Sequence, residues 1–329
     1  MSTNYDLIII GGGPIGIACA LEARKAGLNY LILERGCLVN SLYRYPVNMT
    51  FFSTSERIEI GGIPFVSNHV KPNRAEALEY YRRVAVSNTL NIHLQEGVQQ
   101  VNPHHGVRRE QQGRFEVVSD HRTYNAAHVV LATGFYDIPV LLDIPGEELP
   151  KVTHYYKEPH FYAMQKVIVV GASNSAVDAA LETWRKGAEV TMIIRGEGIG
   201  PRVKYWVKPD IENRIKEGSI KAYTHSGLAA IRPGEVDIET PAGIETIAND
   251  YVIALTGYQP DLSFLRRTGI RLSDDARLQP YYDPETMQTN VPGLYLAGVV
   301  CGGMNTHSWF IENSRVHAEL IVRHIMGNS

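Results

Sequence analysis

Three glycines near the start of the chain, Gly11, Gly13 and Gly16, fit the pattern G-x-G-x-x-G. In such a turn the first glycine permits a tight bend, the second lets backbone approach a pyrophosphate, and the third lets helix and strand pack closely. Glu34 ends the next apolar stretch, where a carboxylate accepts hydrogen bonds from ribose hydroxyls. The pattern predicts a dinucleotide site formed by Gly11, Gly13, Pro14, Ile15, Gly16, Glu34 and Arg35. The alternative is a structural turn beside a surface carboxylate.

A second, looser turn lies in the middle of the chain, with Gly171, Ser173 and Ala176 at the three positions. Arg195 takes the place that Glu34 has in the first turn. A guanidinium pairs with a 2′-phosphate in bidentate fashion, whereas a carboxylate repels it. This difference predicts NADPH at the second turn and FAD at the first, although Arg195 as a solvated strand-end residue is the alternative. The second site would contain Gly171, Ser173, Asn174, Ser175, Ala176, Arg195 and Lys204, with Arg202 nearby.

Both turns need a strand before them and a helix after them. Apolar strands are predicted at Tyr5–Ile10 and Tyr30–Leu33 around the first turn, and at Lys166–Val170 and Glu189–Ile194 around the second. Alternating strands and helices of this length indicate parallel sheets with crossover helices. The expected fold is α/β, with two Rossmann-like three-layer domains, one inserted in the other.

The order of the segments suggests where the inserted domain begins and ends. A further strand, Gly293–Gly298, and a helix over about Thr306–Ile325 are expected to return to the first domain. Hinges are expected at Pro145–Pro150 and Gly257–Asp261. Residues 1–152 with 259–329 would then bind FAD, and residues 153–258 would bind NADPH.

Composition narrows the class of protein. The chain has 329 residues, 44% hydrophobic and 20% charged, with a net charge of −3, which gives no reason to expect a nucleic acid or membrane partner. Its apolar runs are strand-sized, and no secretory signal is visible. Three widely spaced cysteines make neither a disulfide framework nor a metal site, so a reducing cytoplasm is expected.

Two more segments separate this architecture from a simple dehydrogenase, Val129–Gly134 and Thr289–Gly298. Together with the glycine turns they resemble the pyridine nucleotide-disulfide reductases of the low-molecular-weight thioredoxin reductase type, over essentially the whole chain. Within that superfamily the chain is similar to the YpdA-type bacillithiol-disulfide reductases. The matching segments are Tyr45-Pro46, Thr50–Glu56, Ile60-Gly61, Lys71–Arg74, His154-Tyr155, Asn174–Ala180, Lys204-x-Trp206, Ala297–Val299 and Phe310–Asn313.

The resemblance implies electron transfer from NADPH through FAD to a small disulfide, with domain rotation and a homo-oligomeric assembly. It adds flavin contacts at Tyr45, Phe52, Ser53, Thr133, Gly134, Gly298, Val299 and Asn305. The aromatic pair Phe51-Phe52 and Tyr45 would cover the flavin ring, or else form part of the core.

The chain departs from these relatives at sites that matter for the chemistry. It lacks the Cys-x-x-Cys of thioredoxin reductases, which excludes dithiol exchange by that route. Val299 stands where those enzymes have aspartate, a departure that the YpdA-type branch shares. Ile15 stands where that branch has its proposed redox cysteine, and isoleucine cannot form a mixed disulfide.

The candidate catalytic residues are therefore few. Cys19 is expected to pack in the first helix, and Cys37 to lie on or near the surface by the adenosine end. Cys301 precedes the helix expected to approach the flavin, and the positive end of that helix would lower its thiol pKa. Packing is the alternative. Asn305, Thr306 and His307 would start this helix, with His307 as a proton donor or else a capping or surface residue.

Three functions remain open at this point. The first is an NADPH-dependent flavoprotein that reduces a small disulfide. The second passes electrons to ferredoxin, a quinone or oxygen without any cysteine. The third is a redox sensor that binds flavin without appreciable turnover.

Overall fold

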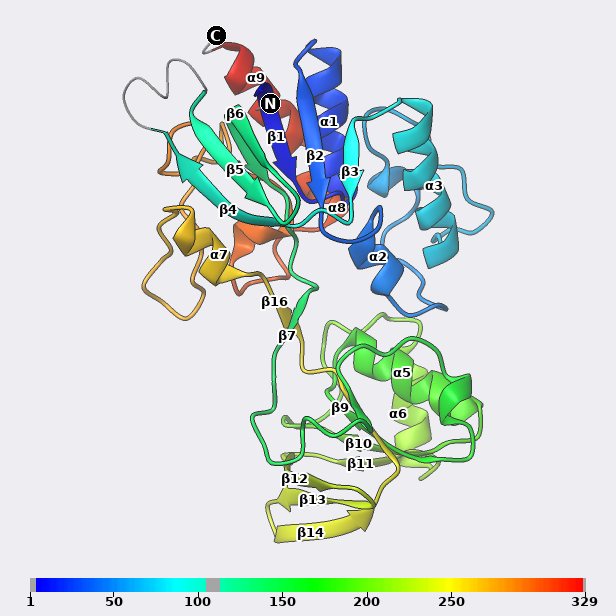
Figure 1. Cartoon of the computed structure of the whole chain (residues 1–329). Coiled ribbons are helices and arrows are strands. Elements are labelled where there is room, and N and C mark those ends of the chain that lie inside the picture. The colour runs from blue at the N-terminus through cyan, green and yellow to red at the C-terminus, as the bar shows by residue number, and fades with distance from the viewer. Residues whose placement is uncertain (1–3, 105–112, 328–329) are drawn as a thin grey trace. The chain divides into compact units, whose positions relative to one another are not determined.

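The computed structural model describes residues 4–104 and 113–327. The chain forms two compact units, the first from Met1–Tyr43, Thr50–Ile138 and Tyr258–Ser329, and the second from Arg44–Met49 and Pro139–Gly257. Figure 1 shows both units as α/β structures, with a sheet and its helices in each. The expected fold of two Rossmann-like units, one inserted in the other, is confirmed.

The first unit is built on a seven-stranded sheet in the order β3-β2-β1-β6-β5-β4, with β17 also paired to β6. The strands β1, β2, β3, β6 and β17 pair in parallel, whereas β4 and β5 are antiparallel. All five residues of β2 are buried, as expected for a strand that is covered on both faces. The strands span Asn4–Ile10 (β1), Tyr30–Glu34 (β2), Ile92–Leu94 (β3), Val98–Pro103 (β4), Phe115–Ser119 (β5), Thr123–Leu131 (β6) and Leu294–Leu296 (β17).

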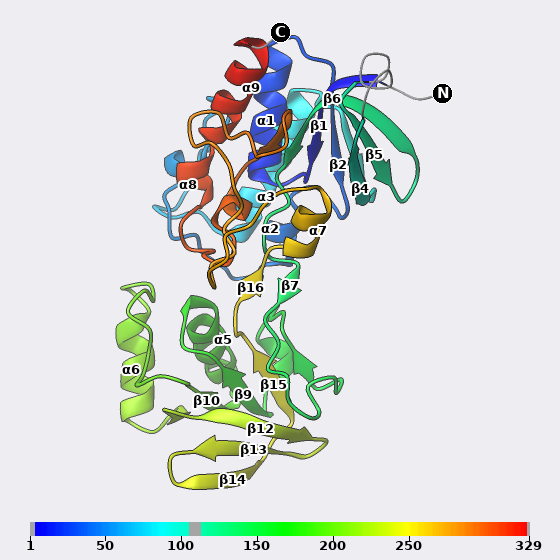
Figure 2. The same ribbon diagram turned by 90° about the vertical axis from the view of Figure 1, so that its left-hand side faces the viewer.

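In the first unit, helix α1 packs along helix α9 (Figure 2). Helix α3 begins with a capping box between Asn73 and Glu76. The helices span Pro14–Lys25 (α1), Asn40–Arg44 (α2), Arg74–Ser87 (α3), Leu262–Arg267 (α7), Ile311–Ser314 (α8) and His317–Gly327 (α9), with 3-10 turns at Glu56–Ile58 and Val299–Gly302.

The second unit has three layers. Its parallel sheet has the order β11-β10-β9-β15-β8, and helix α5 packs with α6 on one face around a core that includes Val177 and Ile211. A three-stranded antiparallel sheet, β12-β13-β14, covers the other face through Val236 and Ile238 (Figure 2). The elements span Val152–Thr153 (β8), Lys166–Val170 (β9), Asn174–Arg185 (α5), Glu189–Ile193 (β10), Lys208–Lys216 (α6), Lys221–Tyr223 (β11), Gly227–Arg232 (β12), Glu235–Thr240 (β13), Gly243–Ala248 (β14) and Tyr251–Ala254 (β15). In the same unit, η2 is a 3-10 turn at His160–Tyr162.

The unit boundaries differ from the expected 152/153 and 258/259. The second unit begins at Pro139, because Leu142, Ile144 and Leu149 pack on its core and β8 pairs with β15. The expected hinge at Pro145–Pro150 therefore lies inside this unit. The chain passes between units at the paired strands β7 (Ile138–Pro139) and β16 (Tyr258–Gln259), the latter within the second expected hinge.

The single helix expected over 306–325 is wrong in its first part. Phe310 is extended, and its N–H donates to Asn313 Oδ1 over 2.7 Å, so that α8 starts only at Ile311. Helix α9 then follows within the predicted range and buries His317, Ala318, Ile321, Val322 and Ile325. Among the described helices, none is both long and apolar enough to cross a bilayer.

Candidate cofactor and electron-transfer site

The first glycine turn is a tight bend that only glycine can form. Gly11 has φ +112°, and its N–H donates to the carbonyl oxygen of Leu33 over 2.9 Å. A β-carbon added there would lie 2.4 Å from the carbonyl oxygen of Ala132. One added at Gly16 would lie 1.9 Å from the carbonyl oxygen of Gly11. Strand, turn and helix are thus in backbone contact, as the sequence predicted.

Gly13 differs from its two neighbours in the motif because the space beside it is open. A β-carbon added at Gly13 would meet no protein atom within 4 Å. The residue is the N-cap of α1, its backbone is extended, and no side chain caps the helix. Pro14 follows as the first helical residue, where its lack of an N–H costs nothing. Free backbone donors at a helix start beside open space fit the phosphates of a dinucleotide.

Glu34 is held against this turn. Its Oε2 accepts from the Gly12 N–H over 2.6 Å, and its Oε1 accepts from the Gly36 N–H over 2.7 Å. Burial raises the pKa of the Glu34 carboxyl, and these two hydrogen bonds oppose the rise. Each oxygen keeps a second lone pair for a hydroxyl donor. Arg35 points its guanidinium elsewhere, to Asp137 at 2.7 Å.

Three segments meet at the carboxyl ends of the parallel strands. Ala132, just before Thr133 and Gly134, donates its N–H to Ile10 at the end of β1 over 2.8 Å. Gly298 has φ +85°, and a β-carbon added there would lie 3.3 Å from the side chain of Ile15, so the two residues are in close contact. The expected flavin-contacting positions Thr133, Gly134, Gly298 and Val299 therefore lie beside the first glycine turn, and Ile15 packs among them.

The aromatic residues expected over the flavin belong to both units. Phe51 is buried, Phe52 is 58% exposed with the Lys71 ammonium 4.9 Å from its ring centroid, and Ser53 is half-buried. Tyr45 belongs to the segment 44–49, which clusters with the second unit. The grouping of Tyr45 with Phe51 and Phe52 over the flavin stays a prediction.

The second glycine turn repeats the geometry of the first. Gly171 has φ +125°, and its N–H donates to the carbonyl oxygen of Ile193 over 3.0 Å. Ser173 is the extended N-cap of α5, again without a side-chain cap. Ser175 is exposed in the first helical turn, and Ala176 is fully buried between helix and strand. The close packing of Ala176 between helix and strand is as the sequence predicted.

The cations near this turn divide into two kinds. Arg195 and Arg202 are exposed. Lys204 is buried, and its Nζ lies 2.7 Å from Asp178 Oδ2, so it is not the pocket cation that was expected. Asn174 holds the loop that contains Arg202 and Lys204. Its Nδ2 donates to the Arg202 carbonyl over 3.1 Å, and its Oδ1 accepts from the Lys204 N–H over 2.8 Å. Lys204 and Asn174 thereby position Arg202 near the start of α5.

Two of the three cysteines, Cys19 and Cys301, offer no activated thiol at the first turn. Cys19 and Cys301 are both fully buried. Burial raises the pKa of the Cys19 thiol to about 12 and also raises that of Cys301. The expected lowering at Cys301 is wrong, since the residue lies in the 3-10 turn and the next helix starts ten residues later, at Ile311. Cys37 is half-buried, with its Sγ 3.6 Å from Asn40 Oδ1.

His307 and Asn305 also lie outside a helix. Both are exposed in the segment before α8, and the His307 N–H lies 3.4 Å from Asn305 Oδ1. Their expected place at a helix start is wrong for the same reason as for Cys301. Nothing in this geometry aims His307 at the first glycine turn.

The histidine that contacts the turn at Gly298 is His317, a buried residue that the sequence analysis did not single out. His317, on α9, is 2% exposed, and its Nδ1 accepts from the Gly298 N–H over 3.2 Å. The Cys301 Sγ is 3.9 Å from the same nitrogen, and the Trp309 ring packs edge-on at 4.6 Å. Burial lowers the pKa of His317 to about 4, so the ring is neutral at pH 7 with its proton on Nε2. Its position on the apolar face of the predicted helix was the available signal.

Comparison with known proteins defines the class. Residues 8–298 match the family of pyridine nucleotide-disulphide oxidoreductases, and the chain belongs to this family. It is therefore a flavoprotein oxidoreductase that uses a flavin and a nicotinamide nucleotide, as the sequence predicted.

Three relatives with 36% to 40% identity carry the same name. The chain is 40% identical over 319 residues to the bacilliredoxin reductase Bdr of Bacillus subtilis (strain 168), covering 97% of this chain and 96% of that protein. Structures of the bacillithiol disulfide reductase Bdr (YpdA) from Staphylococcus aureus and Bacillus cereus are 36% and 38% identical, each with a TM-score of 0.94. Each covers 99% of this chain, and the match spans 99% and 100% of theirs. The predicted membership of the YpdA-type branch is confirmed.

Proposed function

We propose that this protein binds FAD on its first unit and NADPH on its second, and reduces a small-molecule disulfide. The observation that carries the proposal is the pair of glycine turns with one backbone geometry and opposite strand-end charges, Glu34 and Arg195. Two equivalent phosphate sites in one chain call for two nucleotides, and the unlike charges assign them. The related proteins of known structure from Staphylococcus aureus and Bacillus cereus are named for the reduction of bacillithiol disulfide, and we extend this acceptor to the present chain.

The first turn fits FAD in both charge and space. Open room beside Gly13 accommodates a pyrophosphate, and the Glu34 carboxylate is oriented for ribose hydroxyls. When bound, FAD supplies a group that accepts hydride from NADPH and passes two electrons onward. The overall reaction is NADPH + H⁺ + RSSR → NADP⁺ + 2 RSH, in which the disulfide bond breaks and each sulfur gains a hydrogen.

The residues around this turn favour reduction without a protein thiol. Ile15 cannot form a mixed disulfide, and Cys19 and Cys301 are buried with raised pKa values. A thiol of this kind carries almost no thiolate at neutral pH, and the thiolate is the nucleophile in disulfide exchange. We infer that the protein's part is to bind and orient the acceptor beside the flavin.

The test is a two-stage assay on the purified protein. Anaerobic NADPH should bleach the yellow flavin, and bacillithiol disulfide should then restore the colour with release of two thiols per NADPH consumed. The Cys301→Ser variant should keep at least half of this turnover. A colourless protein that cannot be reconstituted with FAD would defeat the proposal, and loss of turnover in the serine variant would defeat the thiol-free route.

A quinone or ferredoxin reductase is the second candidate, favoured by the same lack of an activated thiol. Faster NADPH oxidation with quinones or ferredoxin than with any disulfide would select it. We also place the protein in the reducing cytoplasm as a homo-oligomer, on its free cysteines and on the resemblance. Light scattering on the eluted protein tests the assembly.

A further inference from the structure

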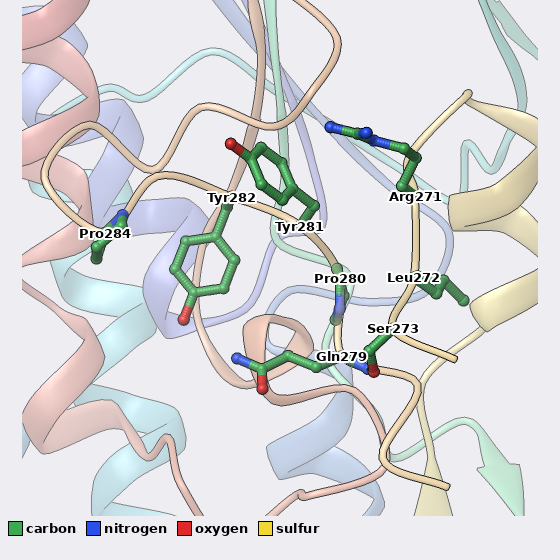
Figure 3. A pocket seen from close by; sticks show the side chains of 8 residues that line it. All are labelled: Arg271, Leu272, Ser273, Gln279, Pro280, Tyr281, Tyr282 and Pro284. Atoms are coloured by element: carbon green, nitrogen blue, oxygen red, sulfur yellow. The ribbon is translucent and has the colours of Figure 1, made fainter. Parts of the chain in front are cut away.

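The first unit contains a cavity of about 610 Å³ that no step above uses (Figure 3). This volume is typical of sites for small molecules. Its walls come from one antiparallel loop, in which Leu272 pairs with Pro280 and the Ser273 N–H donates to the Gln279 carbonyl over 2.8 Å. The Tyr281 N–H donates to the Arg271 carbonyl over 2.8 Å and holds the two residues opposite each other.

The lining of this cavity favours an anion. Arg271 is exposed, with its guanidinium 4.9 Å from the Tyr281 ring centroid, and no carboxylate side chain lines the cavity. Asn290 anchors the arginine, because its Oδ1 accepts from the Arg271 N–H over 2.9 Å. Gln279 and the two tyrosines add an amide and hydroxyl groups. A guanidinium that stacks on a tyrosine beside neutral donors suits a carboxylate in charge, and its two parallel N–H groups can bind both carboxylate oxygens.

The cavity is linked to the turn at Gly298 by a chain of three contacts. Its wall residue Tyr282 forms hydrogen bonds with the side chains of Trp309 and Gln279. Trp309 packs on His317, which accepts the Gly298 N–H. Nearby, the Met304 N–H donates to the Arg277 carbonyl over 2.8 Å and ties the loop that forms the cavity to the segment after Gly298. The cavity therefore lies in the same unit as the segment that we place against the flavin, with two side chains between them.

We propose that this cavity binds the carboxylate-bearing part of the electron acceptor, with Arg271 paired to the carboxylate and Tyr281 and Tyr282 packed against its carbon skeleton. The proposal rests on the proposed function for the reaction itself. It adds the place where the acceptor binds and the chemical class of its recognised end.

The experiment compares two probes on three variants. Bacillithiol disulfide carries free carboxylates, and its methyl ester does not. For Arg271→Gln we expect the KM for the free acid to rise by about tenfold, while the KM for the ester and the rate of flavin bleaching by NADPH stay within twofold. Arg271→Lys keeps the charge but loses the bidentate fork, so its KM should lie between. Arg266→Gln, on the exposed face of α7, is the matched control and should behave as the unchanged protein.

The outcomes separate this proposal from the one it rests on. An equal loss for acid and ester, or an equal effect of Arg266→Gln, would overturn the cavity's role. If the unchanged protein reduces no disulfide at all, the proposed function fails, and calorimetric titration of the oxidised protein with the free acid then decides about the cavity alone. Binding that weakens about tenfold in Arg271→Gln and not in Arg266→Gln supports it; no difference overturns it.

Discussion

The two glycine turns share one backbone geometry but differ in the residue at the end of the following strand. In both, a glycine with positive φ donates its N–H to the neighbouring strand, over 2.9 Å from Gly11 and 3.0 Å from Gly171. The strand-end residues differ in charge and in burial. Glu34 is buried and fixed by two backbone N–H groups, whereas Arg195 is exposed. On the proposed assignment, the backbone binds phosphate in both units and the strand-end side chain selects the nucleotide.

The largest expected effect comes from the third motif position, where the turns differ most. Gly16→Ala places a β-carbon 1.9 Å from the Gly11 carbonyl, whereas alanine is already present at Ala176 in the second turn. We expect Gly16→Ala to lower the free energy of unfolding by about 3 kcal/mol and to yield protein without flavin. Thermal unfolding and the flavin-to-protein absorbance ratio measure both. Gly13→Ala is the control for fold, since its β-carbon meets no protein atom.

The Gly13→Ala control also sharpens the comparison. It should fold normally as the apoprotein and yet bind FAD more weakly. Unchanged FAD affinity would show that the open space beside Gly13 is not where the pyrophosphate lies.

The next effect is a dependence of the free energy of unfolding on pH, caused by His317 beside the turn at Gly298. His317 has a pKa of about 4 in the folded protein, below the ordinary 6.5. The unfolded chain therefore binds more protons between these values, and stability falls as the pH drops from about 6.5 to about 4, by roughly 3 kcal/mol at most. His317→Asn keeps an acceptor for the Gly298 N–H and should remove the His317 part of this slope, while His128, whose pKa burial also lowers to about 4, keeps its own part.

The matched control lies on the same helix. His324 pairs with the Tyr295 hydroxyl at 3.1 Å and is only half-buried. Urea unfolding between pH 4 and 7 compares the slope for His317→Asn with the slopes for His324→Asn and for the unchanged protein. An unaltered slope in His317→Asn would show that another group causes the acid lability.

A smaller effect tests the assignment of the nucleotides. Replacing Arg195 by glutamine removes the expected partner of the 2′-phosphate, so the Kd for NADPH should rise about thirtyfold while that for NADH hardly changes. Titration of the protein with each nucleotide measures this. Lys186→Gln neutralises another exposed charge of the same unit and should leave both affinities within twofold. A parallel loss of NADPH and NADH affinity would contradict the charge-based assignment.

The sequence predicted those features that depend on residues close together in the chain, and it missed those that depend on contacts between distant residues. The glycine turns, Glu34 and Arg195 depend on neighbouring strands and helices, and the structure has them in the expected geometry. His317 gave no signal by type, because its role comes from a contact with Gly298, nineteen residues away. The start of α8 was also misplaced, since an extended Phe310 with a side-chain bond to its N–H overrides the helical pattern.

The smallest expected effect is that of Lys204 on NADPH binding. Lys204 lies close to Arg195 and Arg202 in the sequence, and its replacement tests whether it also contacts the nucleotide. Its ammonium is paired with Asp178 at 2.7 Å and only 9% of its side chain is exposed, so the charge is neutralised inside the unit. Lys204→Gln should therefore change the ratio of the NADH and NADPH Kd values by less than about threefold. Its effect should fall on stability instead, because Asp178 loses its partner, and Asp178→Asn should lower the melting temperature in the same way. A ratio that collapses in Lys204→Gln as in Arg195→Gln would mean that the ion pair opens when NADPH binds, and that the two turns differ in more than their strand-end residues.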